Sequence, residues 1–93
     1  MTPSKTKTSF YRRLYVAYLI DSGVNSAPAI IAATGMPRRT VQDTIAALSE
    51  IGIACEFSGP TKTGMYRIND WGPINSRWIK NNLQHVKDVL DFV

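Results

Sequence analysis

The chain has 93 residues, of which 44% are hydrophobic, and it carries a formal net charge of +4. This length fits one domain, and this apolar content favours a globular fold over intrinsic disorder. No apolar run approaches the ~20 residues needed to cross a bilayer, and the single cysteine, Cys55, excludes an internal disulfide. These features favour a protein of the reducing cytoplasm.

The N-terminal segment also contains the elements of a secretory signal. Basic residues lie between Lys5 and Arg13, the apolar run LYVAYLI follows, and APA at residues 27–29 resembles a cleavage site. However, Asp21 ends the apolar run at its minimum length, and cleavage would cut into a segment with helical periodicity. We therefore favour a cytoplasmic protein over a secreted one.

The first structured element is predicted to follow a polar tail. Residues 1–7 are polar and are expected to be flexible, whereas residues 8–22 have the periodicity of a helix. This helix carries two apolar stripes, one of Phe10, Leu14, Ala17 and Tyr18 and another of Tyr11, Tyr15 and Leu19. A helix that is apolar on two sides requires two partners, so one stripe should face the domain core and the other the last helix or a second subunit.

Residues 26–51 predict two helices joined by a tight turn. Ser26 is a suitable N-cap, Pro28 fits the first helical turn, and Gly35 fits the C-terminal end of the first helix. A second helix follows Pro37, with its buried stripe at Val41, Ile45 and Leu48.

After this helix the apolar period changes from about 3.6 to 2. Residues 53–69 therefore predict a β-hairpin, with Ile53, Cys55 and Phe57 on the buried face of one strand and Tyr66 and Ile68 on the buried face of the other. Residues 75–90 predict a C-terminal helix with an apolar stripe of Ile79, Leu83, Val86 and Leu90. Trp71 and Trp78 are expected to lock this helix onto the domain or to join a dimer contact.

These elements give a single α+β domain over residues 1–93 that is mostly helical. Within it, the stretch IIAATGMPRRTVQDTIAALSEIGI resembles the winged helix-turn-helix of small bacterial transcription regulators of the MarR and IclR type. Their pattern is Ala-Thr-Gly, a hydrophobic residue, Ser or Pro, two polar positions, Thr-Val, and then Leu-x-x-x-Gly before an aliphatic residue. Residues 34–53 match this pattern nearly position for position.

The resemblance covers about residues 8–70 and makes the hairpin tip, near residues 58–64, the "wing". One departure is Ile31, four residues before the turn glycine, where these families usually carry a small residue. It predicts slightly wider packing of the two helices. The whole chain, including INDWGPIN, also resembles a family of small uncharacterised bacterial winged-helix proteins.

The resemblance implies that the helix after Pro37 enters the DNA major groove with its N-terminal residues toward the bases. The exposed positions of its first turns are Arg38, Arg39, Gln42 and Asp43, and Thr40 is a candidate phosphate contact. Arginine can bind guanine and glutamine can bind adenine through two hydrogen bonds each. The alternative is a solvated helix end, but two cations there oppose the helix dipole, which favours a role outside the fold.

Further contacts are implied by the wing and by the charge distribution. Lys62 at the wing tip is expected to reach the minor groove or a phosphate, supported by Thr61 and Thr63, unless this is an ordinary hairpin loop. Residues 1–42 carry six basic residues and one acidic residue, giving +5, whereas residues 43–93 carry five basic and six acidic residues, giving −1. This asymmetry favours an anionic partner, and Arg12 and Arg13 are candidate phosphate contacts; Lys5 and Lys7 fit a solvated tail equally well.

Catalytic and metal-binding signatures are not recognisable. His85 is the single histidine, and with Cys55 it cannot supply three or four metal ligands at a known spacing. Cys55 is expected to be a small core residue and His85 a surface or interface residue. We therefore predict no enzyme, metal or cofactor.

The sequence predicts a regulator that binds double-stranded DNA sequence-specifically. Apolar surface on the N- and C-terminal helices favours a homodimer, because two-fold DNA readers often set their half-site spacing with terminal helices. The alternative function is a winged-helix protein-interaction module without DNA readout, because a fold does not fix a function.

Overall fold

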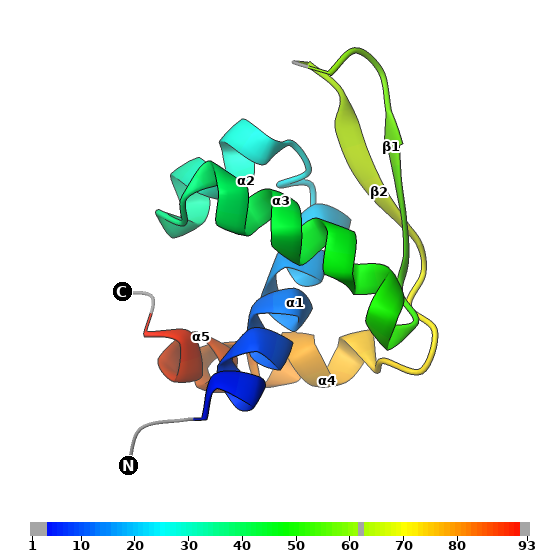
Figure 1. Ribbon diagram of the computed structural model, residues 1–93. Helices are drawn as coiled ribbons and strands as arrows, with labels where there is room; N and C mark the ends of the chain where they lie inside the picture. The colour runs from blue at the N-terminus through cyan, green and yellow to red at the C-terminus, as the bar shows by residue number, and fades with distance from the viewer. Residues whose placement is uncertain (1–3, 62, 92–93) are drawn as a thin grey trace.

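The computed structural model describes residues 4–61 and 63–91. The elements, in chain order, are α1 (Lys5–Asp21), α2 (Ala27–Thr34), α3 (Arg38–Ala46), the 3-10 helix η1 (Ala47–Ile51), β1 (Ala54–Ser58), β2 (Met65–Asp70), α4 (Ser76–Asn81) and α5 (Leu83–Leu90). Figure 1 shows α1 between the α2–α3 pair and the α4–α5 pair, with the β-hairpin at one edge. The predicted α+β, mostly helical fold is confirmed.

Helix α1 forms the centre of the core. Most of its second half is buried, through Leu14, Tyr15, Val16, Ala17, Leu19 and Ile20. It packs against α2, α3, η1, β2, α4 and α5. Most of the two apolar stripes predicted from the sequence therefore finds partners within the same chain, α4 and α5 among them, whereas Phe10 and Tyr11 stay half-buried.

Helix α1 begins earlier than the sequence predicts. Residues 4–7 were expected in a flexible tail, but Lys5 already starts the helix. The hydroxyl of Ser4 accepts a hydrogen bond from the backbone N–H of Lys7 at 3.1 Å, and the Thr8 hydroxyl donates to the Ser4 carbonyl at 3.0 Å. This capping compensates for a first turn that lacks apolar residues, and apolar periodicity alone could not reveal it.

The turn between α2 and α3 follows from a few local interactions. The Ser26 hydroxyl caps α2 by accepting from the N–H of Ala29 at 3.2 Å, and Gly35 ends the helix at φ 75°, where residues with a side chain are disfavoured. The Thr34 hydroxyl then accepts from the N–H of Met36 at 3.1 Å. Ile31 is half-buried at the edge of the core, so the wider helix packing stays a prediction.

Helix α3 is held by the predicted stripe. Val41 and Leu48 are fully buried, and Ile45 is nearly so. The segment differs from one continuous α-helix in its last turn, which is the 3-10 helix η1 and ends at Gly52. This stripe leaves the opposite side of α3 free of packing.

The hairpin pairs β1 with β2 in antiparallel register, with Cys55 opposite Ile68 and Phe57 opposite Tyr66. The N–H of Tyr66 donates to the Asn25 carbonyl at 2.7 Å, which ties the wing to the segment between α1 and α2. The alternation predicts a buried Phe57, but this side chain is 41% exposed. It lies near the end of β1 beyond the core and packs against the Tyr66 ring, with centroids 4.8 Å apart.

The C-terminal helix is two helices rather than one. The break falls at Asn82, whose side-chain amide and backbone N–H both donate to the Trp78 carbonyl, at 2.8 and 3.0 Å. An asparagine side chain that bonds to nearby backbone in this way competes with regular helix. Ile79 and Val86 lie on either side of the break and are both fully buried, so the apolar stripe is kept.

Candidate nucleic-acid interface

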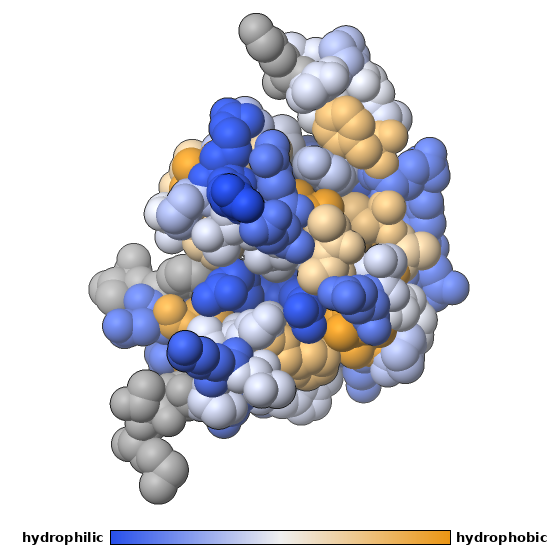
Figure 2. Space-filling model, in the orientation of Figure 1, coloured by the Kyte–Doolittle hydropathy of each residue, from blue (hydrophilic) through white to orange (hydrophobic). Residues whose placement is uncertain are grey.

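Helix α3 presents polar side chains on the surface opposite its buried stripe. Arg38, Arg39, Gln42 and Asp43 are all exposed there, on the first two turns. Figure 2 shows hydrophilic side chains over the N-terminal half of α3. Pro37 precedes the helix, and no side chain caps its N-terminus, so the first backbone N–H groups stay available to an anion.

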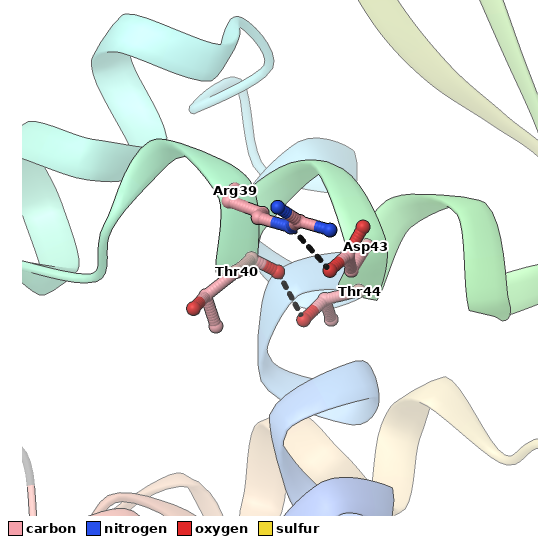
Figure 3. Close-up of polar contacts among 4 residues, drawn as sticks. All are labelled: Arg39, Thr40, Asp43 and Thr44. Carbon is pink, nitrogen blue, oxygen red and sulfur yellow. Dashed lines mark hydrogen bonds and ion pairs between the residues drawn. The ribbon is translucent and has the colours of Figure 1, made fainter.

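One ion pair lies on this surface. Arg39 Nε is 3.9 Å from Asp43 Oδ2, one helical turn away, and the two side chains are 93% and 75% exposed. Figure 3 shows them together on one side of α3. An exposed pair of this kind adds little to stability, so the fold does not explain it.

Thr40 and Thr44 lie on another side of α3, toward α1 (Figure 3). The Thr44 hydroxyl is buried and donates to the Thr40 carbonyl at 2.7 Å. This bond satisfies the hydrogen-bond donor of the Thr44 hydroxyl within its own helix. Thr40 is half-buried, which leaves part of its side chain accessible, as a phosphate contact requires.

A polar groove of about 250 Å³ separates α1 from α3. Its lining comes from both helices and η1: Ser9, Arg12, Arg13, Thr40, Asp43, Thr44 and Ala47. The structure thus brings the two α1 arginines beside two of the predicted α3 residues. Ser9 was missed by the sequence reasoning, although its spacing from Arg12 and Arg13 places all three on one helix face.

The predicted wing residues lie apart from this groove. Thr61 and Thr63 are exposed in the link between β1 and β2, at the far end of the hairpin (Figure 1), and Lys62 lies outside the described residues. The Pro60 carbonyl accepts from the N–H groups of Thr63 and Gly64, at 3.2 and 2.6 Å, which closes the link into a tight turn.

The positive charge around the groove is largely uncompensated. Within residues 4–61 and 63–91, the Arg39–Asp43 pair is the one ion pair, so Arg12, Arg13 and Arg38 have no acidic side chain within 4.0 Å. Arginine side chains without acidic partners attract anions from solution. The surface formed by the first turns of α3 and the facing side of α1 can therefore bind a polyanion and present hydrogen-bonding groups to it.

Comparison with known proteins decides the family. The family described as winged helix-turn helix matches residues 5–90. The protein belongs to this family. The chain is also similar to the crystal structure of a DUF2131 family protein from Shewanella amazonensis SB2B, at 40% identity and a TM-score of 0.90, over 98% of this chain and 91% of that chain. No curated protein matches it.

Membership of this family has consequences for the remaining candidate sites. Winged helix-turn helix domains point to DNA binding and are typically not enzymes. In the described part of the chain, no group of three or more His, Cys, Asp or Glu side chains could hold a metal ion. None of the described helices has the length and apolar character needed to span a membrane.

Cys55 and His85, the residues considered for metal or redox chemistry, do not line the groove between α1 and α3. Cys55 is half-buried in β1, and burial raises the pKa of its thiol, which disfavours the reactive thiolate. His85 is exposed on α5 and makes an edge contact with the Tyr11 ring, with centroids 5.8 Å apart. Both environments fit packing roles in this winged helix-turn helix protein.

Proposed function

We propose that this winged helix-turn helix protein is a small bacterial transcription regulator that binds double-stranded DNA sequence-specifically in the cytoplasm, without enzymatic activity. The observation that carries the proposal is the arrangement of α3, whose packed side holds it to the core and whose exposed first turns carry Arg38, Arg39, Gln42 and Asp43. These side chains are long or polar enough to reach base edges from a helix lying in the major groove.

The groove between α1 and α3 supplies the second part of the interface. Arg12 and Arg13 line it beside Thr40, so DNA whose major groove receives α3 would bring a phosphate close to these groups. Phosphate contacts set the register of a protein on DNA but carry no sequence information. Thr61, Lys62 and Thr63 are proposed as additional contacts from the wing.

Binding to random duplex DNA across a salt series tests DNA binding directly. If about five phosphate contacts release counterions, log K should fall with log[salt] at a slope near −4.5. Fluorescence anisotropy with a labelled duplex measures this slope. A flat salt dependence, or no binding at low salt, would contradict the proposal and favour a protein-interaction module.

Selection of bound DNA from a random pool would then show sequence preference, and an enriched palindrome would indicate two-fold symmetry.

We also propose that the protein acts as a homodimer through α1 and α4. Trp78 is 39% exposed and contacts the Tyr11 ring edge-on, with centroids 6.3 Å apart. A groove of about 280 Å³ beside it is lined mainly by apolar residues: Phe10, Tyr11, Leu14, Pro73, Ile74, Asn75, Trp78 and Ile79. Exposed aromatic surface of this kind marks interaction sites more often than isolated exposed residues do.

The dimer prediction is tested by analytical ultracentrifugation. We expect a dimer at micromolar concentration, and we expect Trp78→Glu to make the protein monomeric because it places a charge on the apolar surface. Phe57→Glu is the matched control, since Phe57 is 41% exposed but lies on the wing. A wild-type monomer at high micromolar concentration would exclude the proposed dimer.

A further inference from the structure

The two arginines at the start of α3 differ in their surroundings. The Nε edge of the Arg39 guanidinium faces Asp43, at 3.9 Å from Oδ2 (Figure 3). Its two terminal nitrogens donate no hydrogen bond to any of the described side chains. These nitrogens form the planar fork that binds guanine O6 and N7 with two hydrogen bonds.

Arg38 has no such orienting neighbour. It is exposed at the first position of α3, and within the described residues no carboxylate lies within 4.0 Å of it. The residue one turn further along the helix is Gln42, which cannot form an ion pair. An unrestrained arginine samples many rotamers and suits a phosphate, which accepts hydrogen bonds from many directions, better than a base edge of fixed geometry.

Asp43 is the one acidic residue of α3. The charged groups that face it are Arg39 on its own helix and Arg12 and Arg13 across the groove, but only Arg39 comes within ion-pair distance. A carboxylate on a surface that binds DNA repels phosphates, so it weakens sequence-independent binding. A role of Asp43 in DNA recognition would therefore be in selectivity rather than in affinity.

We propose that Asp43 is a specificity-determining positioning residue that holds Arg39 for the recognition of a guanine, whereas Arg38 binds phosphate. This inference rests on the proposed DNA-binding function. At 3.9 Å from Nε the carboxylate makes no hydrogen bond, but it attracts the guanidinium and favours Arg39 rotamers that lie along α3 toward Asp43. Less conformational entropy is then lost when the terminal nitrogens bind the base. It also disfavours approach of Arg39 to a phosphate, because the phosphate would then lie close to the negative charge of Asp43.

The test compares sequence preference among variants of the full chain. Duplexes selected by the wild type are re-measured with each base pair changed in turn, for Asp43→Ala, Arg39→Ala, Arg39→Lys and Arg38→Ala. We expect Arg39→Ala to lose about tenfold discrimination at one G·C pair. Asp43→Ala should reduce discrimination at that same pair while binding random DNA more tightly than the wild type, and Arg39→Ala combined with Asp43→Ala should lose no more discrimination than Arg39→Ala alone.

Two variants separate base reading from charge. Arg39→Lys keeps the positive charge but loses the planar fork, so it should bind random DNA normally and lose the guanine preference. Arg38→Ala should weaken binding to all sequences about equally and make the salt slope less steep by about 0.9. Thermal unfolding of each variant checks that the fold is intact, and all these side chains are exposed, so folding should be unaffected.

The outcomes distinguish this inference from the proposed function. If the wild type binds and selects DNA but Asp43→Ala keeps the same base preference, the role of Asp43 is wrong and the DNA-binding function stands. If Arg38→Ala rather than Arg39→Ala relaxes the preference, the assignment of the two arginines is overturned. If the wild type binds no duplex at low salt, both the proposed function and this inference fail.

Discussion

Replacing Leu48 with alanine is expected to lower the free energy of unfolding by about 2–5 kcal/mol. Leu48 is fully buried in η1, in the segment that joins α3 to β1 and packs against α1. Truncation removes apolar contacts and leaves a cavity that the neighbouring helices cannot easily fill. Because small domains have little stability in reserve, a loss of this size should leave a substantial unfolded fraction at physiological temperature.

Urea unfolding followed by circular dichroism measures this loss. The matched control is Ser49→Ala, in the same 3-10 helix, because Ser49 is exposed and the hydrogen bond of its side chain, to the Ala46 carbonyl, is long at 3.5 Å. A loss below about 1 kcal/mol for Leu48→Ala, or an equal loss in both variants, would show that this side chain does not hold α3 in place.

Replacing both Arg38 and Arg39 with alanine is expected to weaken DNA binding by roughly 2–4 kcal/mol without destabilising the fold. One arginine is proposed to bind a base and the other a phosphate, so affinity and sequence preference should fall together. Stability should stay the same or rise slightly, because each cation at the helix N-terminus opposes the dipole by about 0.3–1 kcal/mol. DNA-binding isotherms and thermal unfolding of the same samples separate the two effects.

The control for this double variant removes two cations from another surface. Arg77→Ala with Lys80→Ala changes the net charge equally. Both residues are exposed on α4, and they line neither the α1–α3 groove nor the apolar groove proposed for the dimer. If binding depends only on net charge, the two double variants will weaken it to the same extent. Equal losses would contradict a specific interface on α3, whereas a much larger loss for the α3 variant would support it.

Much of the fold could be predicted because local patterns and long-range packing agree. The stripe of Val41, Ile45 and Leu48 has helical spacing, and the same three side chains are buried in the structure. The turn at Gly35 needs a positive φ, which glycine adopts at low cost, so the residue type alone locates it.

The differences between prediction and structure have local physical causes. The start of α1 depends on a hydroxyl cap at Ser4, and the break before α5 depends on how the Asn82 side chain bonds to the backbone. Neither changes apolar periodicity. Phe57 follows the strand alternation, but β1 extends past the edge of the hydrophobic core, so this side chain is exposed. The alternation of apolar and polar residues along a strand does not show where the core ends.

The candidate site was only partly predictable. The exposed residues of α3 follow directly from its buried stripe, because helix geometry fixes the opposite side. The groove that joins Arg12 and Arg13 to Thr40 and Asp43 depends on how α1 crosses α3, which no local pattern specifies. The i,i+4 spacing of Arg39 and Asp43 permits their ion pair from the sequence alone, whereas the distance from Asp43 to the α1 arginines depends on the same crossing.

The packing of α1 against α5 also constrains when the protein can fold during its synthesis. About 70 residues separate the end of α1 from the end of α5, and the two helices cover one another in the finished core. At about 5–20 residues per second, a ribosome adds these residues in roughly 4–14 s. During that interval the apolar side of α1 has no native partner from α5, so the nascent chain depends on other contacts, or on chaperones, to avoid aggregation until the last helix emerges.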